Sequence, residues 1–340
     1  MRATFHVGRM FVNPLFDYLL IGGVLSLIVI PFLPPTTEFL RGTGDLRMAT
    51  LILFANSCHF AASTVRLYTK EGMFARAPIH TMVLPIASLL LVTACIVWDD
   101  LLGRNLFYLY LTWSPFHYAA QSFGLATMYG HRSGAKLLPD DSRLLWWTAM
   151  LPFIYAFLNS PDAGLSWFVS RVWIEAHPWL DQLLNSAKPA IAVLAFVVPV
   201  LLYFRTRSGG RPGLPMISFA ILISNGVWWI AFQYLDAFGW ATIAHSVQYL
   251  AIVLIFHVRE KQPDGGTLED VVGEVLRFYF KCLVLGYLLF QVLPYAYVAI
   301  GFPLASSILV VAAAINIHHF IVDRVIWRQR SDPNMKVVVR

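Results

Sequence analysis

A series of long apolar runs constrains the fold of this chain more than any other feature. A transmembrane helix needs about 20 apolar residues to cross the ~30 Å hydrocarbon core of a bilayer. We assign such runs to residues 13–33, 46–68, 80–98, 105–129, 144–160, 189–205, 214–235, 238–258, 277–298 and 303–327. The sequence therefore predicts an all-α, polytopic transmembrane helix bundle of about ten spans, with residues 1–340 forming a single transmembrane domain.

The composition excludes a soluble fold. Hydrophobic residues make up 58% of the chain and charged residues only 13%, whereas roughly 25% of a soluble domain is charged. A chain this apolar cannot shield its surface from water. We expect an integral, multi-pass membrane protein, located in a bacterial inner membrane and in contact with membrane lipids.

The basic residues set the expected orientation. If the N-terminus is cytoplasmic, 19 of the 25 Lys and Arg residues fall on the cytoplasmic side and 5 on the other, with Lys281 inside the ninth span. Cytoplasmic loops carry such an excess, so we expect both termini in the cytoplasm. Basic loops beside anionic lipid account for the net charge of +6, and no nucleic-acid partner is needed.

Two stretches between the spans have a character of their own. Residues 161–188 carry Trp167, Trp173 and Trp179, and Trp prefers the headgroup region, so this stretch is expected to be an interfacial segment. Residues 259–277 form the largest predicted cytoplasmic loop. Within it, Thr267 and Asp270 have the spacing of a capping box at the start of a helix.

The three cysteines, Cys58, Cys95 and Cys282, are scattered through apolar runs. An odd, scattered set is not typical of a disulfide framework or a zinc ribbon. We expect small buried hydrophobic residues.

Histidine is the polar residue that recurs deep inside the spans. His59, His117 and His245 lie in the second, fourth and eighth spans, and His318 and His319 lie in the tenth. All four spans run toward the cytoplasm, so these histidines are expected to share one layer near the middle of the bilayer. Ionisable residues in spans are costly and usually face the bundle interior.

Each of these histidines has polar neighbours three or four residues away, on its own helical face. Asn56 and Ser63 flank His59, Gln121 follows His117, Gln248 and Tyr249 follow His245, and Asp323 follows His319. A metal-bound imidazole usually donates its second N–H to such a partner, so Asn56, Gln121, Tyr249 and Asp323 are candidate orienting residues. Imidazole is a common ligand of iron, copper and zinc.

The five histidines are therefore candidate metal ligands. The absence of an interior Cys pair favours iron over a thiolate-bound metal, and haem and copper remain open alternatives. No C-x-x-C-H motif for covalent haem occurs.

Other polar residues in the spans have two interpretations each. Asp17 is either a residue that starts the first helix or a carboxylate near the histidines. Asn225 and Gln233 either line a cavity or hold helices together, and the second role is the more common one.

Four short segments resemble the Brp/Blh family of membrane-integral β-carotene dioxygenases, in which histidines from separate helices hold one iron. They are "CHFAAS" through His59, "FHYAAQSFG" through His117, "AHSVQYL" through His245, and "IHHFIVD" through His318 with Asp323 five residues on. The resemblance implies an iron centre and the oxidative cleavage of a carotenoid-like substrate.

The resemblance and the helix geometry disagree about the last ligand. The register of the motif favours His318. Residues four apart lie on one helix face, so Asp323 is placed to orient His319 instead. We keep both histidines as candidates, with a slight preference for His318.

Three functions are consistent with this sequence. The leading one is a membrane metalloenzyme, a non-haem iron oxygenase acting on an apolar polyene or lipid substrate. The second is a transporter or channel that uses the histidines as a proton or metal relay. It is favoured by prolines inside spans, namely Pro115, Pro152, Pro199 and Pro294. The third is a non-catalytic membrane scaffold.

Overall fold

The computed structural model describes residues 6–36, 50–208, 211–262 and 266–327. These residues belong to two compact units. Unit 1 holds the described residues of 1–43 and 111–248, and unit 2 holds those of 44–110 and 249–337. Both units are helical, and none of the four described ranges contains a strand. The predicted helical class is confirmed, while the predicted positions of the termini lie outside the described residues.

Six helices in the described ranges are long and apolar enough to cross a membrane. They are Ile79–Val97, Pro178–Arg207, Met216–Tyr234, Phe238–Lys261, Leu268–Ala299 and Leu304–Ile326. A bent pair, Pro14–Ile21 with Val24–Phe32, turns by 69° and gives a seventh if it is one span. This set of helices is that of an integral, multi-pass membrane protein.

Three predicted spans are helical but less apolar than these six. Span 46–68 corresponds to the π-helical turn η3 (Ile52–Ser57) and α5 (Cys58–Thr69), and residues 46–49 lie outside the described residues. Span 105–129 is α8 (Arg104–Arg132), and span 144–160 is α9 (Pro139–Asn159). The count of ten spans therefore stays a prediction.

The stretches predicted between spans contain more helix than expected. Residues 161–188 hold α10 (Leu165–Phe168) and α11 (Arg171–Glu175), after which α12 (Pro178–Arg207) begins and continues through the predicted sixth span. In the predicted loop 259–277, α15 (Phe238–Lys261) ends and α16 (Leu268–Tyr287) begins. The predicted capping box starts α16: Asp270 N–H donates to Thr267 Oγ1 at 3.2 Å, and Thr267 N–H donates to Asp270 Oδ2 at 3.1 Å.

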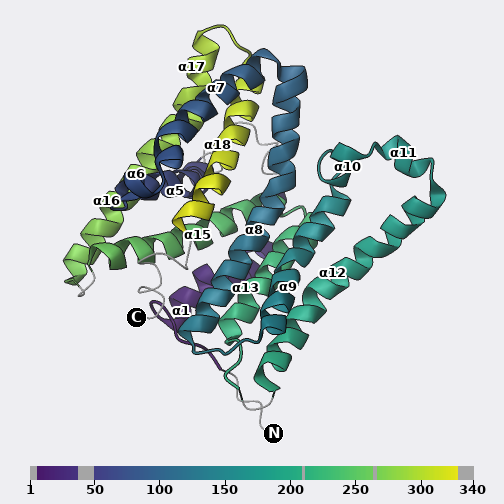
Figure 1. Ribbon diagram of the computed structural model, residues 1–340, viewed down its shortest axis with the longest axis vertical. Helices are drawn as coiled ribbons and strands as arrows, with labels where there is room; N and C mark the ends of the chain where they lie inside the picture. Colours follow the sequence, from purple (N-terminus) through teal and green to yellow (C-terminus); the bar gives the residue numbers. More distant parts are fainter. Residues whose placement is uncertain (1–5, 37–49, 209–210, 263–265, 328–340) are drawn as a thin grey trace. The chain divides into compact units, whose positions relative to one another are not determined.

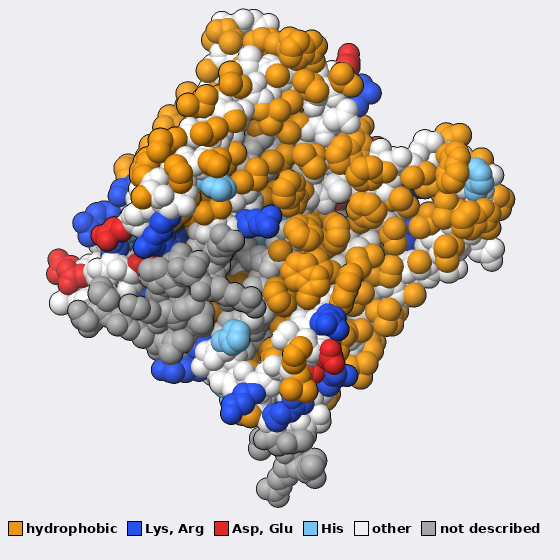
Figure 2. All heavy atoms as spheres, in the orientation of Figure 1, with side chains coloured by type: hydrophobic (Ala, Val, Ile, Leu, Met, Phe, Trp, Pro, Cys, Tyr) orange, Lys and Arg blue, Asp and Glu red, His pale blue; other side chains and the backbone are white. Residues whose placement is uncertain are grey.

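The six candidate spans divide by how much of each is covered by protein. Buried residues make up 22% of the most apolar window in Ile79–Val97, Pro178–Arg207 and Leu268–Ala299, but 61–67% in the other three. Hydrophobic side chains cover much of the face drawn in Figure 2, and exposed ones include Leu90, Leu201 and Phe280. An apolar surface of this extent is suited to lipid, which solvates such side chains as water cannot.

Unit 1 is built on α9, α12 and α13 (Met216–Gly226), which pack together in the teal and green part of Figure 1. Their interface buries Leu145, Ala149, Leu202 and Leu222 in one cluster. Asn225 on α13 donates its Nδ2–H to Ala149 O at 3.2 Å, which agrees with the helix-joining interpretation of this residue.

The first apolar run belongs to unit 1 and is broken at two glycines. It contains α1 (Pro14–Phe16), the π-helical turn η1 (Asp17–Ile21) and α2 (Val24–Val29). Gly23 has a φ of +74°, and a Cβ on it would lie 2.8 Å from Ser224 Cβ. Ser224 Oγ–H donates to Gly22 O at 2.8 Å, so the carbonyl at the break has a partner on α13.

The carboxylate of Asp17 fixes the chain before this first run. It is buried and accepts from the backbone N–H groups of Phe11 and Val12, at 2.6 and 3.1 Å. Tyr129 Oη–H donates to it at 2.7 Å. These contacts favour the helix-start interpretation of Asp17 over a place beside the histidines.

Unit 2 is centred on α5, which packs against α16 and α18 (Leu304–Ile326). In the same unit α7 (Leu84–Val97) and α17 (Leu293–Ala299) pack against α18. The cysteines are buried free thiols, as expected. Cys58 and Cys282 share one core cluster with Ala61, Ala62 and Phe278, a proximity that their separation in sequence did not indicate.

Helix α16 comes close to the last residue of η3, just before α5 begins, at Gly286. A Cβ on Gly286 would lie 2.8 Å from Ser57 O and 3.2 Å from Ser57 Cβ. The obstacle at Ser57 is backbone, which cannot rotate away as a side chain can. Small residues allow such close helix contacts inside membranes.

We expect Gly286→Ala to destabilise the protein by about 1–3 kcal/mol, because the added methyl group forces the two backbones apart. Thermal unfolding of the detergent-solubilised chain measures the effect. Gly273→Ala is the matched control on the same helix, since a Cβ there meets nothing within 4 Å. An equal change in both variants would contradict the close contact.

Candidate metal centre

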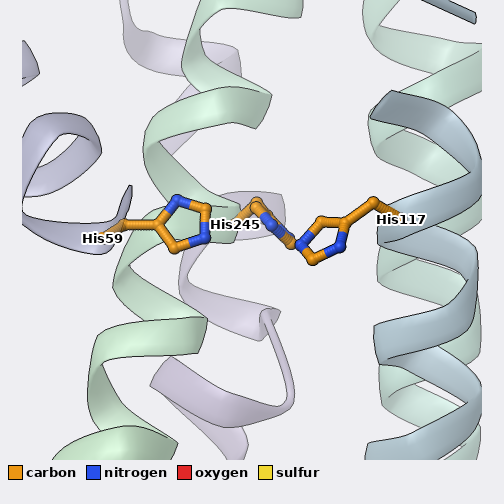
Figure 3. A group of neighbouring side chains, drawn as sticks. All are labelled: His59, His117 and His245. Carbon is orange, nitrogen blue, oxygen red and sulfur yellow. The ribbon is translucent and has the colours of Figure 1, made fainter. Parts of the chain in front are cut away.

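Unit 1 brings two of the predicted ligands together. His117 lies on α8 and His245 on α15, and both are buried, with 8% and 1% of their surfaces exposed. Their ring centroids lie 5.5 Å apart, and the rings are nearly perpendicular, at 82°. Figure 3 shows the two side chains reaching toward each other from their helices. A ligand nitrogen of His117 lies within 4.8 Å of one of His245.

Aromatic and amide groups of unit 1 hold the His245 ring. Tyr118 stacks on it with a centroid distance of 3.5 Å and an interplanar angle of 12°. Gln248 Nε2–H donates to Ile21 O at 2.6 Å, and Gln121 Nε2–H donates to Gln248 Oε1 at 2.8 Å. Gln121 Nε2 also lies 3.5 Å from His245 Nδ1. This amide chain ties the ring to the carbonyl at the end of η1.

Unit 2 brings together a second pair. His59 lies on α5 and His319 on α18, and their exposed fractions are 1% and 0%. The ring centroids lie 4.5 Å apart at an interplanar angle of 81°. Tyr249 also packs against His59, with the ring centroids 4.5 Å apart. His59, which Figure 3 also draws, directly follows the π-helical turn η3 and Cys58, and π-helical turns are frequent at functional sites.

His319 has polar contacts on both sides of its ring. Nδ1 lies 2.9 Å from Ser63 Oγ, and Nε2 lies 3.5 Å from Asp323 Oδ2. Tyr249 Oη–H donates to the other carboxylate oxygen, Asp323 Oδ1. Ser63, His319, Asp323 and Tyr249 therefore form one contiguous polar chain across three helices of unit 2.

The structure favours His319 over His318, against our slight preference from the sequence. His318 is only half-buried on α18, whereas His319 is fully buried and in contact with Asp323. The register of the resembling motif therefore favoured His318, the less buried of the two imidazole rings. The expectation that Asp323 lies beside His319 is confirmed.

Two of the predicted orienting residues, and one further polar neighbour of a histidine, serve other partners than expected. Gln121 contacts His245 and not its own helical neighbour His117. Tyr249 contacts Asp323 rather than His245. Ser63, expected to flank His59, contacts His319. Asn56, the remaining predicted orienting residue, lies half-buried on η3, three residues before His59.

Two other contacts of the unit 1 pair were not predictable from the sequence. Tyr118 follows His117 directly, and aromatic residues are too frequent in this chain for one more to stand out. The acceptor at Ile21 is a backbone carbonyl, which no side-chain pattern reveals. It is available to Gln248 because η1 ends at Ile21, directly before the break at Gly22 and Gly23.

Unit 2 also contains a network of charged groups near the ends of α5 and α15. Arg66 is 1% exposed, and its Nη2–H donates to Glu260 Oε1 at 2.7 Å. Lys70 Nζ lies 3.7 Å from the same oxygen. On the same helix as Glu260, His257 Nε2 lies 2.8 Å from Glu274 Oε1. His257 is therefore buried and paired.

Comparison with known proteins gives no assignment: no family model, curated protein or solved structure matches this chain. The resemblance to the β-carotene dioxygenases therefore stays a prediction.

Removing the charge of Glu260 should destabilise the protein, because it leaves the buried guanidinium of Arg66 without its carboxylate. We expect Glu260→Gln to lower the free energy of unfolding by about 3 kcal/mol, measured by thermal or denaturant unfolding in detergent. Glu269→Gln, at an exposed site in the first turn of α16, should change it by less than about 0.5 kcal/mol. A Glu260 variant as stable as the control would argue against the buried ion pair.

Proposed function

We propose that this chain is a membrane metalloenzyme in which the buried imidazoles of each unit bind metal. The observation that carries the proposal is the pairing of histidines inside each unit, with ring centroids 5.5 Å apart in one and 4.5 Å apart in the other. Imidazoles inside a membrane protein are costly to place and mark functional sites by default. Neutral imidazole is also the most common protein ligand for transition metals.

The proposed ligands are His117 and His245 in unit 1 and His59 and His319 in unit 2. Groups that bind or orient the rings support this choice, because metal-bound histidines are usually held by such contacts. Gln121 and Tyr118 contact His245, while Ser63 and Asp323 contact His319.

Non-haem iron is the proposed metal. The side chains around the histidines offer nitrogen and carboxylate oxygen, donors that suit iron in oxygenases. Cys58 precedes His59, but its thiol packs with Cys282 in an apolar cluster, and buried structural thiols are inert. When bound, the iron would supply the activation of O₂, while the helices exclude water and fix the rings.

The proposed substrate is an apolar polyene or lipid that enters from the bilayer. Support comes from the lipid-suited surface of the spans, where large hydrophobic side chains such as Leu90 and Leu201 are more than half exposed. The proposed reaction is the oxygenation or oxidative cleavage of that substrate. The bacterial inner membrane is the proposed location.

A proton or ion relay is the second candidate, and one feature of α5 favours it. His59, Ser63 and Arg66 follow one another at intervals of four and three residues, so they lie on one face of the helix, and Lys70 comes directly after the helix ends at Thr69. All four are buried or half-buried. A polar stripe of this kind is common to ion pathways. Transport assays in vesicles, set against product analysis with O₂, separate the relay from the oxygenase.

The metal content of the purified chain tests the leading proposal. We expect at least one iron per chain by elemental analysis, and a lower iron content in His117→Ala and in His59→Ala. His131→Ala is the matched control, because His131 is an exposed residue on the same helix as His117. Iron at wild-type levels in both ligand variants would refute the assignment, and a wild-type chain without metal would leave the scaffold as the better account.

A further inference from the structure

The contacts of His319 identify which of its nitrogens carries the proton. Ser63 Oγ–H donates to Phe60 O at 3.1 Å, one turn back on α5, as serines inside helices commonly do. The hydroxyl has only one hydrogen. Ser63 Oγ is therefore the acceptor in its 2.9 Å contact with His319 Nδ1, and Nδ1 carries a hydrogen.

It follows that Nε2 of the neutral ring carries the lone pair, the form in which an imidazole nitrogen binds a metal ion. Its neighbour, 3.5 Å away, is Asp323 Oδ2, which is also electron-rich. The second oxygen of that carboxylate, Oδ1, already accepts from Tyr249 Oη–H. Nε2 and Oδ2 are thus two donor atoms close together at a buried site, and a cation bound by both would stabilise the arrangement.

A proton or a metal ion could supply that charge, and the distance discriminates between them. A charge-assisted N–H···O bond spans about 2.7–2.9 Å, so 3.5 Å is too long for a good one. Two ligands at about 2.0–2.1 Å from one tetrahedral ion lie about 3.4 Å apart. The observed separation matches two ligands of one ion better than a protonated pair.

We infer that Asp323 is a direct metal ligand through Oδ2, with His319 Nε2 as its neighbour on the same ion. Ser63 positions the ring by accepting from Nδ1–H, and Tyr249 positions the carboxylate by donating to Oδ1. This inference rests on the proposed metal function and changes the role of Asp323 from an orienting group to a ligand. An imidazole beside a carboxylate suits divalent ions such as Fe²⁺, Co²⁺ and Zn²⁺ better than soft Cu⁺.

Co²⁺ added alone to the metal-free, detergent-solubilised chain is the probe, because its visible absorption reports binding and coordination. We expect Asp323→Asn to weaken Co²⁺ binding by about 1,000-fold or more, because the amide oxygen carries no charge. Loss of an outer partner costs about 10–100-fold, so Ser63→Ala and Tyr249→Phe should stay in that range. Asp323→Glu keeps the carboxylate and should recover part of the affinity.

A loss of less than about 100-fold in Asp323→Asn would overturn the direct-ligand role. If Asp323→Asn does not fold, the infrared difference spectrum of the wild-type chain, Co²⁺-loaded minus metal-free, decides the question. A shifted carboxylate stretching band is expected, and its absence would overturn the inference. A wild-type chain that binds neither Co²⁺ nor iron would instead remove the proposed function itself, so the two failures are distinguishable.

Discussion

A polar group placed in hydrocarbon must find its partner inside the protein, and the interior of this chain is organised by that requirement. A buried polar group without a partner costs several kcal/mol. In unit 1 the buried polar groups are partnered by a series of polar contacts that runs from Ile21 O through Gln248 and Gln121 to His245. In unit 2 a corresponding series of polar contacts runs from Ser63 through His319 and Asp323 to Tyr249. The contacts that make burial tolerable are the same ones that orient the imidazoles.

The sequence identified the polar residues near the histidines but mostly not their partners. Gln121, Tyr249 and Ser63 were found by their spacing from a histidine on the same helix, yet each contacts a group on another helix. Spacing along a helix reports only which residues share a face. Which helix covers that face depends on tertiary packing. Asp323 is the exception, since its partner His319 lies one turn away on α18.

Helical class was predictable because apolar runs leave few other ways to satisfy a backbone in lipid. The number of spans was harder to predict, and the reason lies in the site itself. Helices α5 and α8 carry His59, Ser63, His117 and Gln121, and such residues lower the hydropathy on which span assignment depends. The proximity of Cys58 and Cys282 was unforeseen for another reason: it arises where α5 crosses α16, and sequence separation says nothing about helix crossings.

The length of two apolar helices has a geometric consequence. Leu268–Ala299 has 32 residues and Pro178–Arg207 has 30, so these helices are about 45–48 Å long at 1.5 Å per residue. The acyl region is only about 30 Å thick. Each helix must either tilt away from the bilayer normal or extend past the acyl chains into the headgroups. In the second case Leu268 and Val272, both exposed at the first turns of α16, would lie among glycerol and phosphate groups rather than in open water.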